Sequence, residues 1–184
     1  MNLPNYITLL RIFLVPVFYS FLLYYNSSHT FFRALAIALF LIAISSDAAD
    51  GFIARTFKKQ TELGTFLDPL ADKLLLLSGF FGITLSSAFI IKPPIWVIVV
   101  IVFRDLFIIC GLVIIFLTTR QLRIRPNLLG KLTTFFQMLT ILVVLIGWEH
   151  SRFVWFGAVS LTIASAFAYL VRGIKLINGL TNIT

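Results

Sequence analysis

Four aspartates lie in two close pairs within the segment 47–72, Asp47 with Asp50 and Asp68 with Asp72. Residues three or four apart share one face of a helix, so each pair directs its carboxylates the same way. The pairs fall at the adjoining ends of two consecutive predicted helices, where the four carboxylates are expected to converge. Converging carboxylates repel one another, and a divalent cation relieves that repulsion. Oxygen-only ligands suit hard ions, so the pattern predicts Mg²⁺ or Mn²⁺, with enough carboxylates for two ions.

Helix capping offers a second interpretation for part of this cluster. Asp68 precedes Pro69, a combination typical of an N-cap followed by proline at the first helical position. Asp72 would then lie in the first turn, where the helix dipole favours an anion. Asp47 and Asp50 lie toward the C-terminal end of their predicted helix, where the dipole disfavours anions. Capping therefore does not explain this pair.

The elements that position these residues are predicted to be membrane-spanning helices. Hydrophobic residues make up 60% of the 184-residue chain, and its mean hydropathy is +1.03. About six spans of roughly 20 residues each fit this length. We expect an all-α integral membrane protein formed by a single domain over 1–184, with a short interfacial helix over 1–10 before the first span. The expected spans are 11–25, 32–46, 69–91, 95–118, 128–148 and 153–171.

The basic residues predict how these spans are oriented. Eleven of the fifteen Lys and Arg residues fall on the side that holds both termini, the 47–72 segment and the 120–131 loop. Arg33, Lys92 and Arg152 fall on the other side, and Arg104 lies within a span. The positive-inside rule then places the aspartates at the cytoplasmic face of the cell membrane. The net charge of +8 is explained by orientation and anionic lipids rather than by nucleic acid.

Small and basic residues accompany the aspartates. Gly51, Ala54 and Gly64 would let a phosphorylated ligand approach the backbone, although small residues equally permit close packing of membrane helices. Arg55 supplies a guanidinium that can bind phosphate in a bidentate manner.

The segment resembles the complete signature of the CDP-alcohol phosphatidyltransferases, with the spacing Asp47-x2-Asp50-Gly51-x2-Ala54-Arg55-x8-Gly64-x3-Asp68-x3-Asp72. The resemblance implies transfer of a phosphatidyl group from CDP-diacylglycerol to an alcohol, with release of CMP. It further implies that Asp47, Asp50 and Asp68 bind the metals, with Asp72 contributing and acting as the base, and that the enzyme is a homodimer. The CDP site would be formed by Asp47, Gly51, Ala54, Arg55, Gly64 and Asp68.

Other motifs resemble the branch of this family that uses glycerol-type acceptors. They are the opening N-L-P-N-x-I-T-x-x-R and the later Gly130-Lys131-x-x-Thr134-x-x-Gln137. The branch includes enzymes that use glycerol 3-phosphate and cardiolipin synthases that use phosphatidylglycerol. Two features depart from the enzymes that use glycerol 3-phosphate. Arg104 is followed by Asp rather than Glu, with no second Arg, which shifts the pattern toward cardiolipin synthases. Thr133 stands where Lys is usual, and the missing Arg and Lys remove cations. Both acceptors therefore stay open.

Arg104 and Asp105 form a charged pair inside a predicted span. Adjacent residues do not face each other on a helix, so we expect each to have its own partner. The candidates for acceptor binding are Arg104, Asp105, Arg123, Arg125 and Lys131. For Arg123 and Arg125, a role as positive-inside loop residues is the alternative.

Two alternatives to this assignment remain. Within the family, inositol phosphate, serine or choline would be other acceptors. Outside it, a small proton-coupled transporter would also place acids and an Arg-Asp pair in a membrane. The acids at one face, rather than at the midplane, and the lack of an inverted repeat favour the enzyme.

Overall fold

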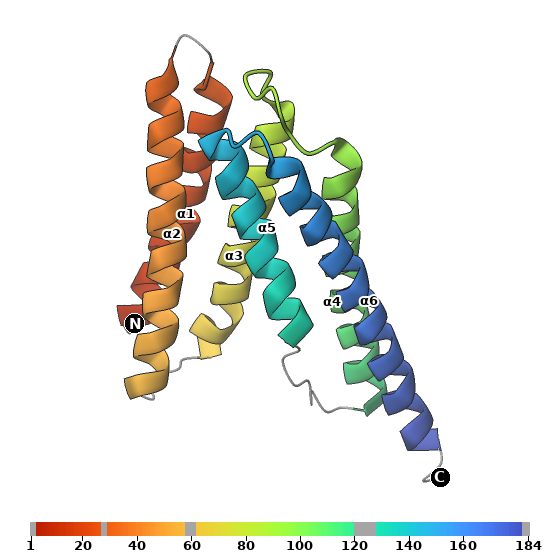
Figure 1. The fold of residues 1–184 in the computed structure, drawn as a ribbon. Coiled ribbons are helices and arrows are strands. Elements are labelled where there is room, and N and C mark those ends of the chain that lie inside the picture. Colours follow the sequence, from red (N-terminus) through yellow and green to blue (C-terminus); the bar gives the residue numbers. More distant parts are fainter. Residues whose placement is uncertain (1–2, 27–28, 58–61, 120–127, 182–184) are drawn as a thin grey trace. The chain divides into compact units, whose positions relative to one another are not determined.

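The computed structural model describes residues 3–26, 29–57, 62–119 and 128–181, without the side chains of 3–7, 47–57, 62–66, 68–69, 112–119 and 174–181. These ranges contain six helices and no strand, which confirms the all-helical prediction (Figure 1). The helices are α1 (Leu3–Tyr24), α2 (Thr30–Phe57), α3 (Glu62–Leu85), α4 (Ile95–Thr119), α5 (Leu128–Ile146) and α6 (Ser151–Thr181).

The N-terminal segment is not a separate interfacial helix. α1 begins at Leu3 and continues without interruption to Tyr24, so the predicted boundary at residue 10 is wrong. Pro4 lies in the first turn, where a proline removes no hydrogen bond that the helix needs. Arg11 does not mark an aqueous boundary either, because its side chain is buried inside the protein.

The helices around the aspartates are longer than their apolar cores predict. α2 continues to Phe57 and α3 begins at Glu62, so four residues separate the two helices. Asp68 and Pro69 consequently lie inside α3, and the interpretation of Asp68 as an N-cap is wrong. A proline inside a helix removes only its own bond to the carbonyl four residues back, so the turns before it can still be helical.

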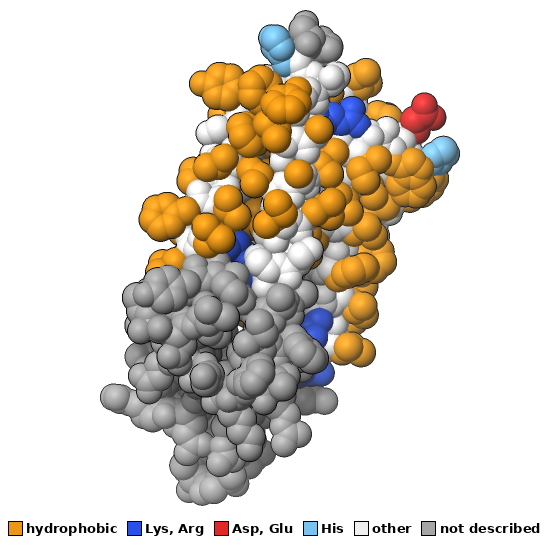
Figure 2. Space-filling view, turned by 90° about the vertical axis from the view of Figure 1, so that its left-hand side faces the viewer, with side chains coloured by type: hydrophobic (Ala, Val, Ile, Leu, Met, Phe, Trp, Pro, Cys, Tyr) orange, Lys and Arg blue, Asp and Glu red, His pale blue; other side chains and the backbone are white. Residues whose placement is uncertain are grey.

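The described surface is rich in apolar side chains. Leu128–Ile146 and Ser151–Gly173 are long and apolar enough to cross a membrane, and Thr8–Tyr24 and Thr30–Ser46 are shorter apolar helical stretches. Hydrophobic side chains cover most of the described surface in Figure 2. Phe13 and Phe153, for example, are 71% and 75% exposed. Outward-facing apolar side chains at this density are consistent with a membrane protein.

The chain divides into two compact units, of which unit 1 comprises Met1–Lys92 and Ile141–Ser151. In unit 1, α1 packs against both α2 and α3. Phe18 of α1 stacks on Phe40 of α2, with ring centroids 5.5 Å apart. Leu22 of α1 contacts α3 at Gly82, where an added Cβ would lie 2.9 Å from the Leu22 Cβ. Glycine at this position therefore sets how closely α1 and α3 approach.

An arginine of α2 and a glycine cap the C-terminal end of α5, and both of these residues belong to unit 1. Gly147 has a φ of 77°, which L side chains rarely adopt. The Trp148 amide donates to the Val143 carbonyl at 3.0 Å, the six-residue bond of a Schellman motif. The Arg33 Nε donates to the Leu145 carbonyl. The guanidinium thus satisfies one of the carbonyls that the helix end leaves without a partner.

Unit 2 comprises Pro93–Thr140 and Arg152–Thr184. Here α4 and α6 run in the same direction and α5 runs opposite to them (Figure 1). Polar side chains connect α5 to α6. The Gln137 Nε2 donates to the Thr162 Oγ1 at 3.2 Å, and the Thr133 Oγ1 donates to the Leu161 carbonyl at 3.1 Å. Such bonds link helices whose surroundings are otherwise apolar.

Candidate active site

The aspartates of the 47–72 segment lie at two adjoining helix ends of unit 1. Asp47 and Asp50 belong to the C-terminal part of α2, and Asp68 and Asp72 to the N-terminal half of α3. The end of α2, the beginning of α3 and the beginning of α1 lie at the same end of this unit (Figure 1). The helical placement preserves the expected shared face within each pair.

Most side chains of this segment lie outside the described part of the structure. They are those of Asp47, Asp50, Gly51, Ala54, Arg55, Gly64 and Asp68. Convergence of all four carboxylates on one metal site therefore stays a prediction. Among the described side chains, no group of three or more His, Cys, Asp or Glu could hold a metal ion. The donor set that the sequence supplies, four carboxylates, fits a hard divalent ion.

Asp72 is described, and it forms an ion pair with Arg11. The Arg11 Nη1 donates to the Asp72 Oδ1 at 3.0 Å, across the contact between α1 and α3. The side chain of Arg11 is 0% exposed and that of Asp72 is 25% exposed. A buried guanidinium needs a hydrogen-bonded anion near it, and Asp72 is such an anion. The carboxylate in turn keeps a partly open side.

Arg11 is a residue that our list of candidate site residues missed. It ends the motif N-L-P-N-x-I-T-x-x-R, and Thr8, one turn earlier on the same face of α1, is also buried. The available signal was a lone arginine in an apolar helix, since an ionisable residue at membrane depth usually has a partner and a function. The sequence did not indicate which of the seven acids was that partner.

Arg104 and Asp105 contact each other directly, so the expectation that they would not face each other is wrong. The Arg104 Nη1 lies 2.7 Å from the Asp105 Oδ1, and its Nη2 donates to the Ser165 Oγ of α6 at 2.8 Å. Helix geometry separates the Cβ atoms of adjacent residues, but the long arginine side chain folds back across the helix surface. Arg104 is also 6.0 Å from the centre of the Tyr169 ring.

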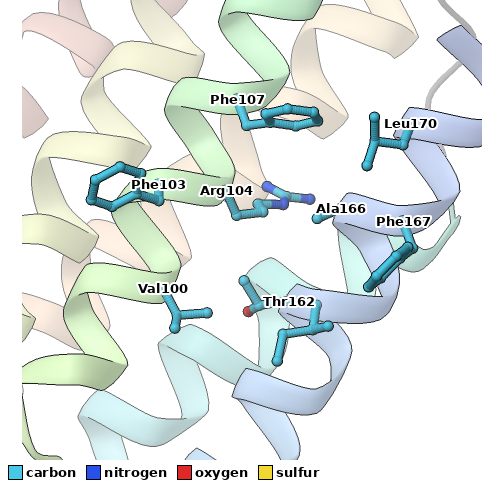
Figure 3. A pocket seen from close by; sticks show the side chains of 9 residues that line it. Val100, Phe103, Arg104, Phe107, Thr162, Ala166, Phe167 and Leu170 are labelled. Atoms are coloured by element: carbon cyan, nitrogen blue, oxygen red, sulfur yellow. The ribbon is translucent and has the colours of Figure 1, made fainter.

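A cavity of about 330 Å³ lies between α4 and α6 in unit 2, beside Arg104 (Figure 3). Arg104 and Thr162 supply its polar groups, and the remaining lining side chains are apolar: Val100, Phe103, Phe107, Ile163, Ala166, Phe167 and Leu170. Gly130 of α5 adjoins this region, because a Cβ there would lie 3.4 Å from the Arg104 Nη2. Of the other acceptor candidates, Lys131 is exposed on α5, and Arg123 and Arg125 lie outside the described residues.

Comparisons with known proteins agree on one family. The family model described as CDP-alcohol phosphatidyltransferase matches residues 1–170. A Mycobacterium tuberculosis protein named probable phosphatidylglycerophosphate synthase is 35% identical over 97% of this chain and 85% of its own length. Two proteins named CDP-diacylglycerol–glycerol-3-phosphate 3-phosphatidyltransferase are also similar. The one from Bacillus subtilis is 35% identical over 79% of this chain and 77% of its own length. The one from Rickettsia typhi is 33% identical over 94% and 93%.

Proposed function

The chain belongs to the CDP-alcohol phosphatidyltransferase family, and we propose that this phosphatidyltransferase uses glycerol 3-phosphate as its acceptor. The products are phosphatidylglycerophosphate and CMP. The observation that carries the proposal is the complete Asp47–Asp72 signature at the adjoining ends of α2 and α3. The names of relatives that match most of this chain support the choice of acceptor.

Asp72 acts as the general base in this proposal. An acceptor hydroxyl gives its proton to the Asp72 carboxylate while its oxygen attacks the phosphatidyl phosphorus. The bond from that phosphorus to the oxygen of the CMP phosphate breaks, and CMP departs with the bonding electrons. The carboxylate is suited to the role because one oxygen is held by Arg11 and the group is partly exposed.

The metal ligands are Asp47, Asp50 and Asp68, with Asp72 contributing, and the ions are two Mg²⁺ or Mn²⁺. When bound, they offset the negative charge of the pyrophosphate linkage and of the departing phosphate. Bound cations would also offset the negative charge of Asp47 and Asp50 at the end of α2, where the helix dipole disfavours anions.

CDP binds beside the aspartates. Gly51, Ala54 and Gly64 leave the backbone accessible to the nucleotide, and Arg55 contacts phosphate. Asp47 and Asp68 complete this site. A position at a helix end near the membrane surface suits a donor whose acyl chains lie in lipid and whose nucleotide lies in water.

The acceptor site includes Arg104, Asp105 and Lys131, together with the loop residues Arg123 and Arg125. One observation favours phosphatidylglycerol as a second candidate. The Arg104 guanidinium already has a carboxylate partner in Asp105, so the pair has no net charge to attract a phosphate dianion. Phosphatidylglycerol as acceptor would give cardiolipin.

The setting that we propose is a multi-pass protein of the cell membrane in which all six helices cross the bilayer. Its active site faces the cytoplasm, because the side with most Lys and Arg residues stays inside. We further propose that the enzyme is a homodimer.

The decisive measurement is CMP release by the purified protein from CDP-diacylglycerol and Mg²⁺. Glycerol 3-phosphate, phosphatidylglycerol and inositol phosphate are supplied in parallel, and EDTA is added to a matched sample. We expect release with glycerol 3-phosphate, its loss in EDTA and a decrease of about 10²–10⁴-fold in Asp72→Asn. Arg152→Gln, an exposed residue outside the site, serves as the control.

Each contrary outcome has a separate meaning. Release with phosphatidylglycerol alone would replace the proposed product with cardiolipin. Full activity of Asp72→Asn would remove this residue as the base. Activity that survives EDTA would contradict the proposed metal dependence.

A further inference from the structure

The ion pair between Arg11 and Asp72 joins two helices that are far apart in sequence. The residues are 61 positions apart, and the two atoms lie 3.0 Å from each other. Arg11 projects from α1, which packs along α3, and its side chain has no exposed surface. Substrate in the partly open region around Asp72 therefore meets the carboxylate rather than the guanidinium.

Because Arg11 is buried, its guanidinium can fix the orientation of the Asp72 carboxylate. A carboxylate on its own can rotate about its side-chain bonds and exchange partners with water. A bond from the rigid guanidinium of a packed helix fixes where one of its oxygens lies. Precise placement of a catalytic group has large rate effects, because small displacements weaken proton transfer and attack.

We propose that Arg11 is a positioning residue for the reaction: it holds the Asp72 carboxylate in the orientation that accepts the proton of the acceptor hydroxyl. The inference rests on the proposed function, in which Asp72 is the base. The Arg11 side chain has no exposed surface from which to contact the acceptor, and its proposed effect on the reaction is exerted through the Asp72 carboxylate. Its loss should lower kcat and leave the KM values for both substrates within about twofold, because substrate binding does not involve it.

A purely structural role predicts a different result. If Arg11 only fastened α1 to α3, its replacement would lower thermal stability, and each folded molecule would keep its kcat. Its effect on rate would also be independent of Asp72. The two roles therefore differ in whether the kinetic effects of the residues are coupled.

A double-mutant cycle on kcat tests this coupling. The variants are Arg11→Gln, Asp72→Asn and the double variant, with Arg152→Gln as the control at an exposed arginine. We expect about a 10–100-fold lower kcat for Arg11→Gln and about a 10²–10⁴-fold lower kcat for Asp72→Asn. The double variant should be no slower than Asp72→Asn. Multiplication of the two single effects would overturn the proposal, as would a kcat of Arg11→Gln within twofold of the unchanged enzyme.

Arg11→Lys provides a second variant if Arg11→Gln does not fold. Lysine keeps the positive charge and loses the planar fork, so it should retain the fold and lower kcat about tenfold, with unchanged KM values. An unchanged kcat in this variant would show that orientation is not supplied by the guanidinium.

Failure of the inference is distinguishable from failure of the proposed function. No CMP release by the unchanged protein would refute the function. Release that depends on Asp72 but not on Arg11 would refute the positioning role alone.

Discussion

The two buried arginines in the described part of the chain, Arg11 and Arg104, each contact specific polar groups. Arg11 pairs with Asp72, and Arg104 pairs with Asp105 and with the hydroxyl of Ser165. Placing a charged side chain at the centre of a membrane costs about 2.5–3.5 kcal/mol on insertion scales. Matching groups offset part of that cost, so replacing any one of them should destabilise the protein.

Ser165→Ala tests this expectation away from the aspartates. The change removes the acceptor of the Arg104 Nη2, and we expect a loss of about 1 kcal/mol in the free energy of unfolding. Thermal stability in detergent is the measurement. Ser160→Ala is the matched control on α6, because the Ser160 hydroxyl is exposed and bonds only to the Phe156 carbonyl of its own helix. Equal effects of the two changes would contradict the assigned role of Ser165.

Residue partners were harder to predict than residue types. The site roles of the 47–72 aspartates and of Gly51, Ala54, Arg55 and Gly64 were inferred from spacing and from the family resemblance, and they stay predictions. The partner of Asp72 was not, because it lies 61 positions away and depends on how α1 packs on α3. The Arg104–Asp105 contact was predicted wrongly because the helix rule describes Cβ directions and not the reach of a long side chain.

The helices show a similar division between what hydropathy predicts and what it does not. α4 and α5 were expected at 95–118 and 128–148, close to Ile95–Thr119 and Leu128–Ile146. The helical continuation of α2 through Asp47 and Asp50 was predicted, but its full extent to Phe57 and the beginning of α3 at Glu62 were missed. Those turns contain charged and small residues, and hydropathy reports the lipid-facing core of a helix rather than its hydrogen-bonded length.

Gly82 offers a test of helix packing in unit 1. An alanine Cβ there would lie 2.9 Å from the Leu22 Cβ, so α1 and α3 would have to move apart. We expect Gly82→Ala to lower stability by about 1–3 kcal/mol. Gly111→Ala is the control, because no described atom lies within 4 Å of its added Cβ, and alanine favours helix by about 1 kcal/mol. A stabilised Gly82→Ala, measured by heating in detergent, would contradict the close approach.

At the scale of the whole molecule, family membership is established along nearly the full chain, while the six-span topology stays a prediction. The family model covers residues 1–170, and two helical stretches among the described residues meet the length and hydropathy of a span. The single domain expected over 1–184 likewise stays a prediction.

Labelling of single cysteines in intact cells tests the topology. Cys110 is first replaced by alanine, and a cysteine is then placed at His29, Ile90, Glu149 or Lys131, all of which are exposed. The connections α1–α2, α3–α4 and α5–α6 should lie outside, so the first three positions should react with a membrane-impermeant maleimide. Lys131 should react only after the cells are opened. Labelling of Lys131 in intact cells would reverse or refute the predicted orientation.

The Arg11–Asp72 pair also has a consequence for biosynthesis. The ribosome completes α1 long before it reaches Asp72, which lies 61 residues beyond Arg11. Until then the nascent helix carries a guanidinium whose anionic partner does not yet exist, and lipid alone is a poor environment for it. In the predicted six-span topology, we therefore expect α1 to wait at the membrane interface, with Arg11 hydrated, until α3 has been translated. The first helix would then be among the later ones to reach its final depth.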